Sequence, residues 1–169
     1  MDDLENQLSQ HHPAAFGWAL ACCKWNRAAA EDVLQTAYLK VLDGRARFAG
    51  RADFRAFLFG VIRRTANEER RHNAIRSLIP IGDHESPGAG AAGLDLMVQD
   101  ERSQELIAAL NALSARQREV LHLVFYQDLT IAAAADVLGM SVGSARVHYE
   151  RGKANLRRLL DEERDDAKR

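Results

Sequence analysis

Apolar positions recur every three or four residues along most of this chain, and the strict alternation of a half-buried β-strand is nearly absent. That period is typical of helices with one buried face. It predicts seven helices, over residues 13–24, 28–42, 54–73, 100–113, 115–125, 131–138 and 142–164. Pro13 would lie in the first turn of the first helix, a position that proline tolerates. The sequence therefore predicts an all-α protein.

The periodicity stops between the third and the fourth of these helices. Residues 77–93 read SLIPIGDHESPGAGAAG, with two prolines and four glycines. Such a composition favours a flexible connection over a helix. We therefore expect two small helical domains, spanning 1–76 and 99–169, joined by a flexible linker over 77–98.

The predicted helix 54–73 changes character along its length. Its first half is aromatic and apolar, with Phe54 and Phe57, and its second half carries Arg63, Arg64, Arg70 and Arg71. Aromatic rings stack on unpaired bases and arginines neutralise phosphates, so the combination suits single-stranded or opening DNA. The alternative is a helix whose aromatic residues belong to the core and whose arginines form a solvated face.

The last two predicted helices are separated only by residues 139–141. Thr130 and Ser141 are expected to cap them, and so short a turn predicts a steep crossing of the helix-turn-helix type. Small residues at the crossing let the two backbones approach closely: Ala134, Ala135 and Ala145. The alternative is a helical hairpin with a solvated basic face.

The final helix has an apolar stripe at the spacing of a buried face, and the residues between form a polar surface. The expected stripe is Val142, Ala145, Tyr149, Gly152, Leu156 and Leu159. The expected outer residues are Gly143, Ser144, Arg146, Val147, His148, Arg151 and Asn155. A recognition helix reads DNA with its N-terminal turns, so Ser144, Val147 and His148 are expected at base edges. We expect Arg146, Arg151 and Lys153 to contact phosphates or nearby bases.

Charge is distributed unevenly in this chain of 169 residues, although its net charge is only -1. Residues 45–76 carry nine arginines against three acids, and residues 141–158 carry five bases against one acid. Two separate basic segments indicate two places of contact with a polyanion.

The remaining features exclude several classes of protein. No apolar run is long enough to span a bilayer, and the polar start is not that of a secretory signal, so we expect a cytoplasmic protein without membrane insertion. Cys22 and Cys23 are expected to be reduced, partly buried thiols; the alternative is a metal or redox site with His11 and His12. We expect no cofactor, and an enzyme is disfavoured because no phosphate loop or activated nucleophile is evident.

Three segments resemble one family, the extracytoplasmic-function (ECF) sigma factors of bacterial RNA polymerase. AEDVLQTAYLKVL (30–42) resembles the helix that docks on the clamp of the polymerase β′ subunit. FAGRADFRAFLFGVIRRTANEERR (48–71) is similar to the segment that melts and reads the −10 promoter element. The stretch 109–160, which includes LTIAAAADVLGMSVGSARVHYERGK, resembles the domain that binds the −35 element and the β flap.

The resemblance implies a role for individual residues. Asp32, Gln35 and Tyr38 would contact the polymerase. The −10 element would be contacted by Phe57, Arg63, Arg64, Asn67, Arg70 and Arg71, and the −35 element by Ser144, Arg146, Val147, His148, Arg151 and Lys153. The loop 43–53 corresponds to the one that captures an unstacked base in the family. An anti-sigma factor is a further partner that the resemblance implies.

Several departures from the family pattern lie where promoter sequence is read, and two others are Thr36 and Ala133. Val147 and His148 replace a common Ser-Arg pair, Arg64 stands where asparagine is common, and Glu68 replaces the usual aspartate. Two other functions stay open at this point: a sigma mimic that binds an anti-sigma factor without binding DNA, and a helix-turn-helix regulator that acts without polymerase.

Overall fold

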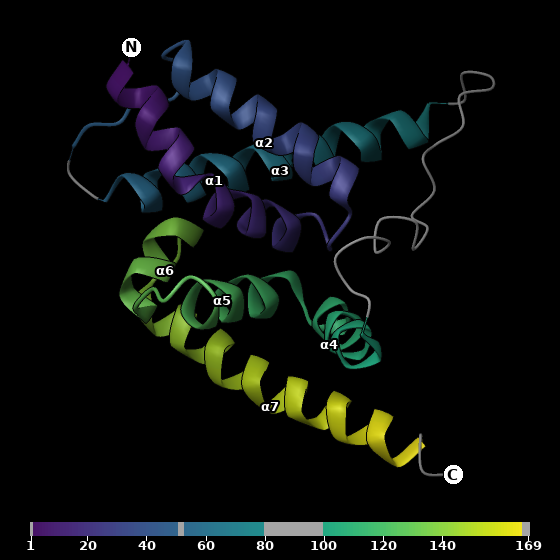
Figure 1. Cartoon of the computed structure of the whole chain (residues 1–169). Coiled ribbons are helices and arrows are strands. Elements are labelled where there is room, and N and C mark those ends of the chain that lie inside the picture. Colours follow the sequence, from purple (N-terminus) through teal and green to yellow (C-terminus); the bar gives the residue numbers. More distant parts are fainter. Residues whose placement is uncertain (1, 51–52, 80–99, 167–169) are drawn as a thin grey trace. The chain divides into compact units, whose positions relative to one another are not determined.

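The computed structural model describes residues 2–50, 53–79 and 100–166, and every regular element in these ranges is an α-helix (Figure 1). The prediction of an all-α protein is confirmed. The chain divides into two compact units, Met1–Leu94 and Asp95–Arg169. Most of the linker predicted over 77–98 lies outside the described residues.

The described part of unit 1 contains three helices that all pack on one another: α1 (Asp2–Cys22), α2 (Arg27–Leu42) and α3 (Phe54–Leu78). Its core contains the fully buried Trp18, Leu58, Phe59 and Ile62. The indole Nε1 of Trp18 donates a hydrogen bond to the carbonyl oxygen of Phe59 at 3.0 Å. A buried indole needs such a partner, and this one ties α1 to the second turn of α3.

The start of α1 differs from the prediction, because the helix begins at Asp2 and Pro13 lies inside it. Residues before Pro13 already carry a helical apolar spacing, and Leu8 is buried in the core of unit 1. The proline ring is exposed. The packing of Leu8 therefore offsets the backbone hydrogen bond that a proline cannot donate.

The second helix begins where the sequence predicts a break. The side chain of Asn26 caps α2 by accepting a hydrogen bond from the backbone N–H of Ala29 at 3.0 Å. The apolar face of α2 is buried at Val33, Leu34 and Val41, whereas Leu42 is 44% exposed. Leu42 is the last residue of α2, so no further turn packs beside it.

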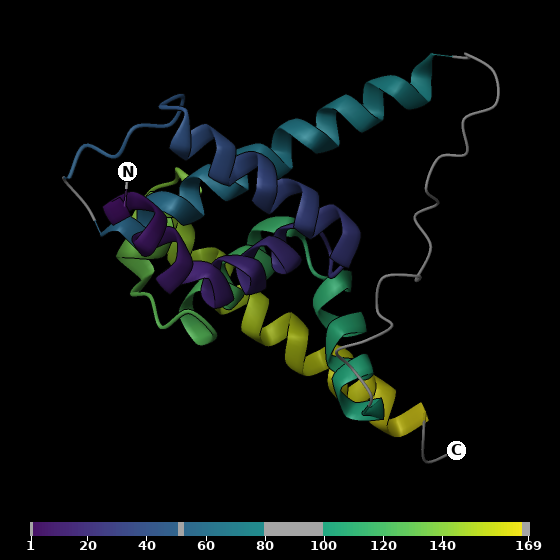
Figure 2. The same cartoon turned by 45° about the horizontal axis from the view of Figure 1, so that its top comes forward.

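The third helix is longer than predicted and projects from its partners. It continues to Leu78, so residues 77 and 78 are helical rather than part of the predicted linker. No residue from 67 to 79 is buried. Figures 1 and 2 show the C-terminal half of α3 extending beyond α1 and α2.

Unit 2 contains α4 (Glu101–Ala112), α5 (Ala115–Phe125), α6 (Ile131–Leu138) and α7 (Val142–Asp166). The other three helices all pack against α7. The predicted cap at Thr130 is confirmed, because Thr130 Oγ1 accepts from the N–H of Ala133 at 3.1 Å. Ser114 caps α5 in the same way, since its Oγ accepts from the N–H of Gln117 at 3.4 Å. These local bonds set where α5 and α6 begin.

Candidate nucleic-acid and protein interfaces

The turn between α6 and α7 has the chemistry of a tight helix-turn-helix. Gly139 adopts a left-handed conformation with φ 61°, and its N–H bonds the end of α6. Ser141 Oγ accepts a hydrogen bond from the N–H of Ser144 at 3.1 Å and so caps α7. Glycine tolerates the left-handed geometry that ends α6, and serine then starts α7 two residues later.

The crossing of α6 and α7 is made of small residues. Ala134, Ala135 and Ala145 are fully or almost fully buried, as the sequence predicts. On the next turns of α7, Gly152 faces α5, where an added Cβ would meet Leu121 Cδ1 at 3.1 Å. Close packing of backbones therefore holds α7 in place along its first three turns.

The opposite face of α7 is open. Ser144, Arg146, Val147 and Arg151 are exposed, and Val147 is 45% exposed although it is apolar. His148 is half-buried at the edge of this face. We call these five residues, together with Lys153, the α7 face. The structure thus brings the six residues predicted for the −35 element onto one helix, five of them along its outer side.

Lys153 sits at the margin of the α7 face and is held there. Its ammonium lies 4.3 Å from the centroid of the Tyr149 ring and 3.1 Å from Glu150 Oε2. Tyr149 in turn stacks on Phe125, with ring centroids 5.8 Å apart. These contacts keep the positive charge of Lys153 close to the outer face.

Two positions on α7 differ from the prediction. Val142, expected to face inward, is 43% exposed because it is the first residue of the helix and precedes the contact with α6. Asn155, expected to face outward, donates a hydrogen bond from Nδ2 to Gln117 Oε1 at 3.2 Å. Asn155 therefore helps to fix α7 on α5.

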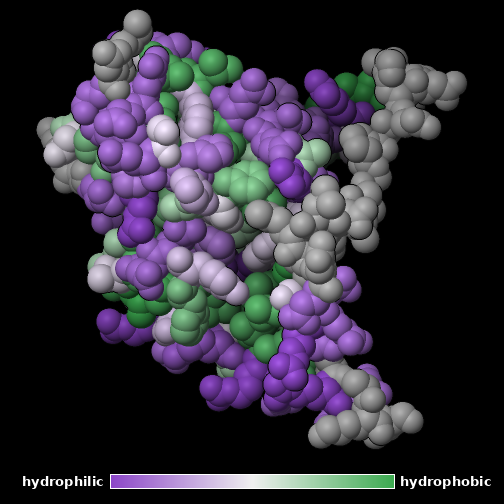
Figure 3. Space-filling model, viewed as in Figure 1, coloured by the Kyte–Doolittle hydropathy of each residue, from purple (hydrophilic) through white to green (hydrophobic). Residues whose placement is uncertain are grey.

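The basic half of α3 forms a second open surface. Arg64, Arg70 and Arg71 are exposed, and Arg63 and Asn67 are partly exposed. A guanidinium nitrogen of Arg70 donates to Asn67 Oδ1. Figure 3 shows the projecting end of α3, at the upper right, as mainly hydrophilic with hydrophobic surface near its tip. This surface has the charge that phosphates require.

The aromatic half of α3 divides between the core and the surface. Phe54 and Phe59 are buried and belong to the core of unit 1. Phe57 is only half-buried and lies 5.3 Å from Phe48 and 5.9 Å from Phe54 between ring centroids. Phe48 belongs to the loop before α3 and is itself partly exposed. The pair Phe48 and Phe57 is the aromatic surface available to a ligand.

A cavity of about 390 Å³ opens beside Phe57. Its polar lining residues come from α2, α3 and the loop between them: Lys40, Arg45, Arg47, Arg64, Thr65 and Glu68. The ammonium of Lys40 pairs with Glu68 and also donates to Thr65 Oγ1 at 3.2 Å. The sequence analysis named none of Lys40, Arg45 and Arg47 individually. Arg45 and Arg47 belong to the loop 43–53, which the resemblance assigned to an unstacked base.

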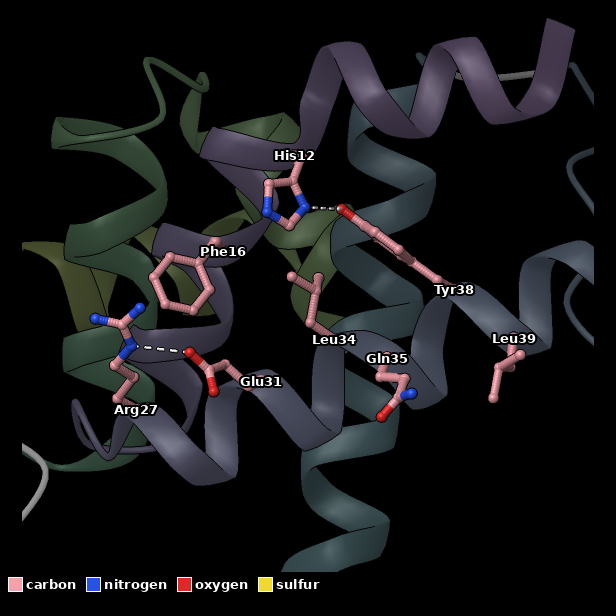
Figure 4. A pocket seen from close by; sticks show the side chains of 8 residues that line it. All are labelled: His12, Phe16, Arg27, Glu31, Leu34, Gln35, Tyr38 and Leu39. Atoms are coloured by element: carbon pink, nitrogen blue, oxygen red, sulfur yellow. Dashed lines mark hydrogen bonds and ion pairs between the residues drawn. The ribbon is translucent and has the colours of Figure 1, made fainter. Parts of the chain in front are cut away.

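A second cavity, of about 540 Å³, lies between α1 and α2 (Figure 4). Phe16, Leu34 and Leu39 give it an apolar lining, and Gln35 points toward it from α2. His12 Nδ1 and the hydroxyl of Tyr38 are 3.0 Å apart at its rim. Burial raises the pKa of Tyr38 to about 12.

The three residues predicted for the polymerase do not share one environment. Gln35 and Tyr38 line the cavity of Figure 4. Asp32 is exposed on α2 outside its lining. Phe16 and His12 add aromatic surface from α1, with ring centroids 6.4 Å apart. An apolar floor with polar groups at its rim suits a protein partner.

The histidine pair of α1 and the cysteine pair at the end of this helix have different neighbours. His11 stacks on Phe54 with centroids 5.8 Å apart, while His12 contacts Phe16 and Tyr38. Neither Cys22 nor Cys23 takes part in a disulfide; Cys22 is buried and Cys23 is half-buried. Burial raises the pKa of Cys23 to about 11, with Arg70 lowering it and Glu69 raising it further. Within the described ranges, no cluster of three potential ligands could hold a metal ion.

In the part of the chain that the structure describes, no helix combines the length and apolar character needed to cross a membrane.

Comparison with known families gives one match in each unit. The family model of Sigma-70 region 2 matches residues 8–75. The family model of Sigma-70, region 4, matches residues 103–156. The first match includes all of α2 and most of α3, and the second includes the α6–α7 turn and the α7 face.

Similar curated proteins extend over most of the chain. The RNA polymerase sigma factor CarQ of Myxococcus xanthus is 28% identical over 161 residues, covering 95% of this chain and 91% of the relative. The ECF RNA polymerase sigma factor SigX of Bacillus subtilis is 29% identical over 136 residues, covering 78% and 70%.

Solved structures share the fold. The sigma factor RpoE, in a complex with the anti-sigma factor NepR from Bartonella quintana, matches with a TM-score of 0.71 at 24% identity, covering 95% of this chain and 98% of that chain. CnrH, in a complex with the cytosolic domain of CnrY, matches with a TM-score of 0.65 at 21% identity, covering 94% and 88%.

Proposed function

Because this chain belongs to the ECF sigma factors of the sigma-70 family, we propose that it binds core RNA polymerase and directs promoter recognition and the initiation of transcription. The observation that carries the proposal is the α7 face. A tightly capped turn and the buried Ala145 and Gly152 hold α7 against its partners, while Arg146, Val147 and Arg151 stay open on the other side. That arrangement suits a recognition helix in a major groove.

The α7 face is the proposed reader of the −35 element. Ser144, Val147 and His148 lie in the first two turns, where a recognition helix reaches base edges. Arg146, Arg151 and Lys153 flank them and are assigned to phosphates or adjacent bases. The half-buried position of His148 limits it to one edge of the groove.

The basic half of α3 is the proposed reader of the −10 element. Its phosphate and base contacts are assigned to Arg63, Arg64, Asn67, Arg70 and Arg71. Beyond position 66 no residue of this helix is buried. Phe57, beside Phe48 and the 390 Å³ cavity, is assigned to stacking on an unpaired base. Aromatic surface next to arginines is what strand separation requires.

Contacts with proteins are proposed for both units. Asp32, Gln35 and Tyr38 would bind the β′ clamp, with the cavity between α1 and α2 as the apolar part of that surface. Unit 2 would contact the β flap. An anti-sigma factor is proposed as a regulator, since RpoE was solved in a complex with one. We propose domains over 1–76 and 99–169, with residues 77–98 between them, of which 77 and 78 extend α3, and a cytoplasmic location.

Transcription in vitro tests the proposal. The purified chain is added to core RNA polymerase with fragmented genomic DNA as template, and the transcripts are sequenced. We expect transcripts that begin at a small set of sites sharing two sequence elements. The absence of any start site that depends on the added protein would contradict the proposal.

Charge reversal on α7 supplies the matched variants. Arg151→Glu is expected to reduce transcription from these sites more than tenfold, because it places an acid on the DNA-facing side. Arg158→Glu lies further along the same helix, where Arg158 pairs with Glu162 at 2.8 Å, and should change transcription less than twofold. If the wild type and both variants bind core polymerase but none of them binds DNA, the chain is a sigma mimic instead.

A further inference from the structure

Glu150 lies at the centre of the open side of α7. Its side chain is 61% exposed, and no other acid occurs between positions 142 and 154. At 3.6 residues per turn, Val147 and Glu150 point away from the buried Ala145, with Arg146 and Arg151 on either side of them. An acid therefore occupies the middle of a surface proposed to face DNA.

The residues in line with Glu150 along the helix are short. Gly143 and Ala154 are exposed, and an added Cβ at Gly143 would contact only Ser141 Oγ, at 4.0 Å. Val147 offers only two methyl groups. Short side chains along this line allow the backbone of α7 to lie deep in a groove. In that position Glu150 faces base edges, while Arg146 and Arg151 reach outward to the phosphates.

The negative charge of Glu150 is balanced within the helix. Lys153 Nζ lies 3.1 Å from Glu150 Oε2 and is itself positioned over Tyr149. This pairing reduces the repulsion between the carboxylate and the phosphates. A carboxylate has about four lone-pair sites, so it can hold the ammonium and still accept hydrogen bonds from a base.

We propose that Glu150 is a specificity-determining residue that selects cytosine at one position of the −35 element. Cytosine presents an exocyclic N4 amino donor in the major groove, with no acceptor beside it. Guanine and thymine present acceptors that repel a carboxylate, and in adenine the N7 acceptor lies next to the amino group. The inference rests on the proposed function of α7 and adds the base chemistry that this chain selects.

Selection from a DNA library tests the inference with the complete holoenzyme. Core polymerase carrying the wild-type chain is incubated with promoters randomised across the −35 element, and the bound DNA is sequenced. We expect enrichment of cytosine at one position, by about tenfold over the other bases. Glu150→Ala should abolish this enrichment while the preferences at the other positions stay unchanged.

Glu150→Gln is expected to change the preferred base, and not only to abolish the preference for cytosine. An amide accepts from adenine N6 and donates to N7, so the preferred base at that position should change from cytosine to adenine. Helicity measured by circular dichroism should match the wild type for both variants, since Glu150 is exposed.

Glu162→Ala is the matched control. Glu162 lies on α7, is 58% exposed and pairs with Arg158 at 2.8 Å, much as Glu150 pairs with Lys153. It is about 18 Å further along the helix, outside the proposed contact. Selection with Glu162→Ala should reproduce the wild-type preferences.

Two results would overturn the inference in distinguishable ways. If Glu150→Ala and the wild type select the same bases at every position, Glu150 does not read DNA, and the proposed function stands. If the wild-type holoenzyme selects no −35 sequence at all, the proposed function fails and the inference fails with it.

Discussion

Gly152 of α7 lies so close to Leu121 of α5 that a Cβ added to the glycine would be 3.1 Å from Leu121 Cδ1 and 3.3 Å from Leu121 Cγ. The same Cβ would be 3.3 Å from Gln117 Cβ. Gly152 is next to both Arg151 and Lys153 in the sequence. The contact with Leu121 therefore sets how closely this part of α7 packs against α5.

The contact predicts a size-dependent loss of stability at Gly152. Alanine should change the free energy of unfolding little, because a gain in helix propensity of about 1 kcal/mol offsets the tight contact. Valine should destabilise unit 2 by about 2 kcal/mol through overpacking against Leu121. Hydrogen exchange of the α5 and α7 amides measures the effect.

Ala154→Val is the control for the Gly152 variants, because Ala154 is exposed on the same helix. It should cost only the lower helix propensity of valine, about 0.5 kcal/mol. Tryptophan fluorescence should not change in either variant, since Trp18 and Trp25 both belong to unit 1. Equal loss of protection in Ala154→Val and Gly152→Val would contradict the packing argument.

The cap of α7 predicts a second effect. Ser141→Ala removes the oxygen that accepts from the N–H of Ser144, at a cost of about 1 kcal/mol. The first turn of α7 then frays, and binding to promoters that require the −35 element should weaken about fivefold in a filter-binding assay. Ser141→Thr keeps the cap and should restore most of the binding; failure of this rescue would show that Ser141 acts in another way.

The exposed Arg151 predicts a change in salt dependence. Arg151→Ala should reduce the slope of log K against log salt by about 1, because one phosphate contact is lost. Titrations of holoenzyme with promoter DNA at several salt concentrations measure this slope. Arg158→Ala, which loses a pairing with Glu162, should leave the slope unchanged. A slope that is equal in wild type and Arg151→Ala removes Arg151 from the interface.

The buried His122 predicts that unit 2 loses stability in mild acid. Burial lowers the pKa of His122 to about 4, while the unfolded chain takes up the proton near the ordinary value of 6.5. The unfolded state thus binds more protons between these values, so stability is complete above pH 6.5 and falls as the pH drops toward 4. The loss reaches about 3 kcal/mol.

Replacement of His122 checks this pH dependence. His122→Gln keeps a polar side chain next to Gln127 Nε2, which lies 3.2 Å from His122 Nε2 in the wild type. The variant should be less stable at pH 8 but should lose less stability than the wild type between pH 6.5 and 4.5. Chemical denaturation, monitored by hydrogen exchange of the α5 amides, gives the stability at pH 8 and its loss between pH 6.5 and 4.5. Parallel pH profiles would exclude His122 as the cause.

Helix boundaries that depend on local chemistry could be predicted from the sequence. Ser114, Thr130 and Ser141 each accept a hydrogen bond from an N–H three residues later, and Gly139 needs only its own backbone freedom. Such interactions are complete within one turn, so they are visible in the order of residues. The exception is the start of α1, where the core position of Leu8 outweighs Pro13.

The composition of the candidate surfaces was also predictable, but their details were not. The arginines of α3 and the outer residues of α7 follow from helical spacing alone. The burial of Phe59 and the partial exposure of Phe57 depend on what packs against α3 from α1 and the preceding loop. Asn155 turns inward because Gln117 of α5 offers a hydrogen-bond partner 38 residues earlier in the chain.

The sequence by itself determined the helices, their caps, the helix-turn-helix and the two basic segments, because each depends on residues within a few positions of one another. Only the tertiary structure decided which groups meet across helices. Lys40 joins Glu68 over 28 residues, and Trp18 reaches the carbonyl of Phe59 over 41 residues. The physical reason is that these contacts depend on the packing of whole helices, which no local period encodes.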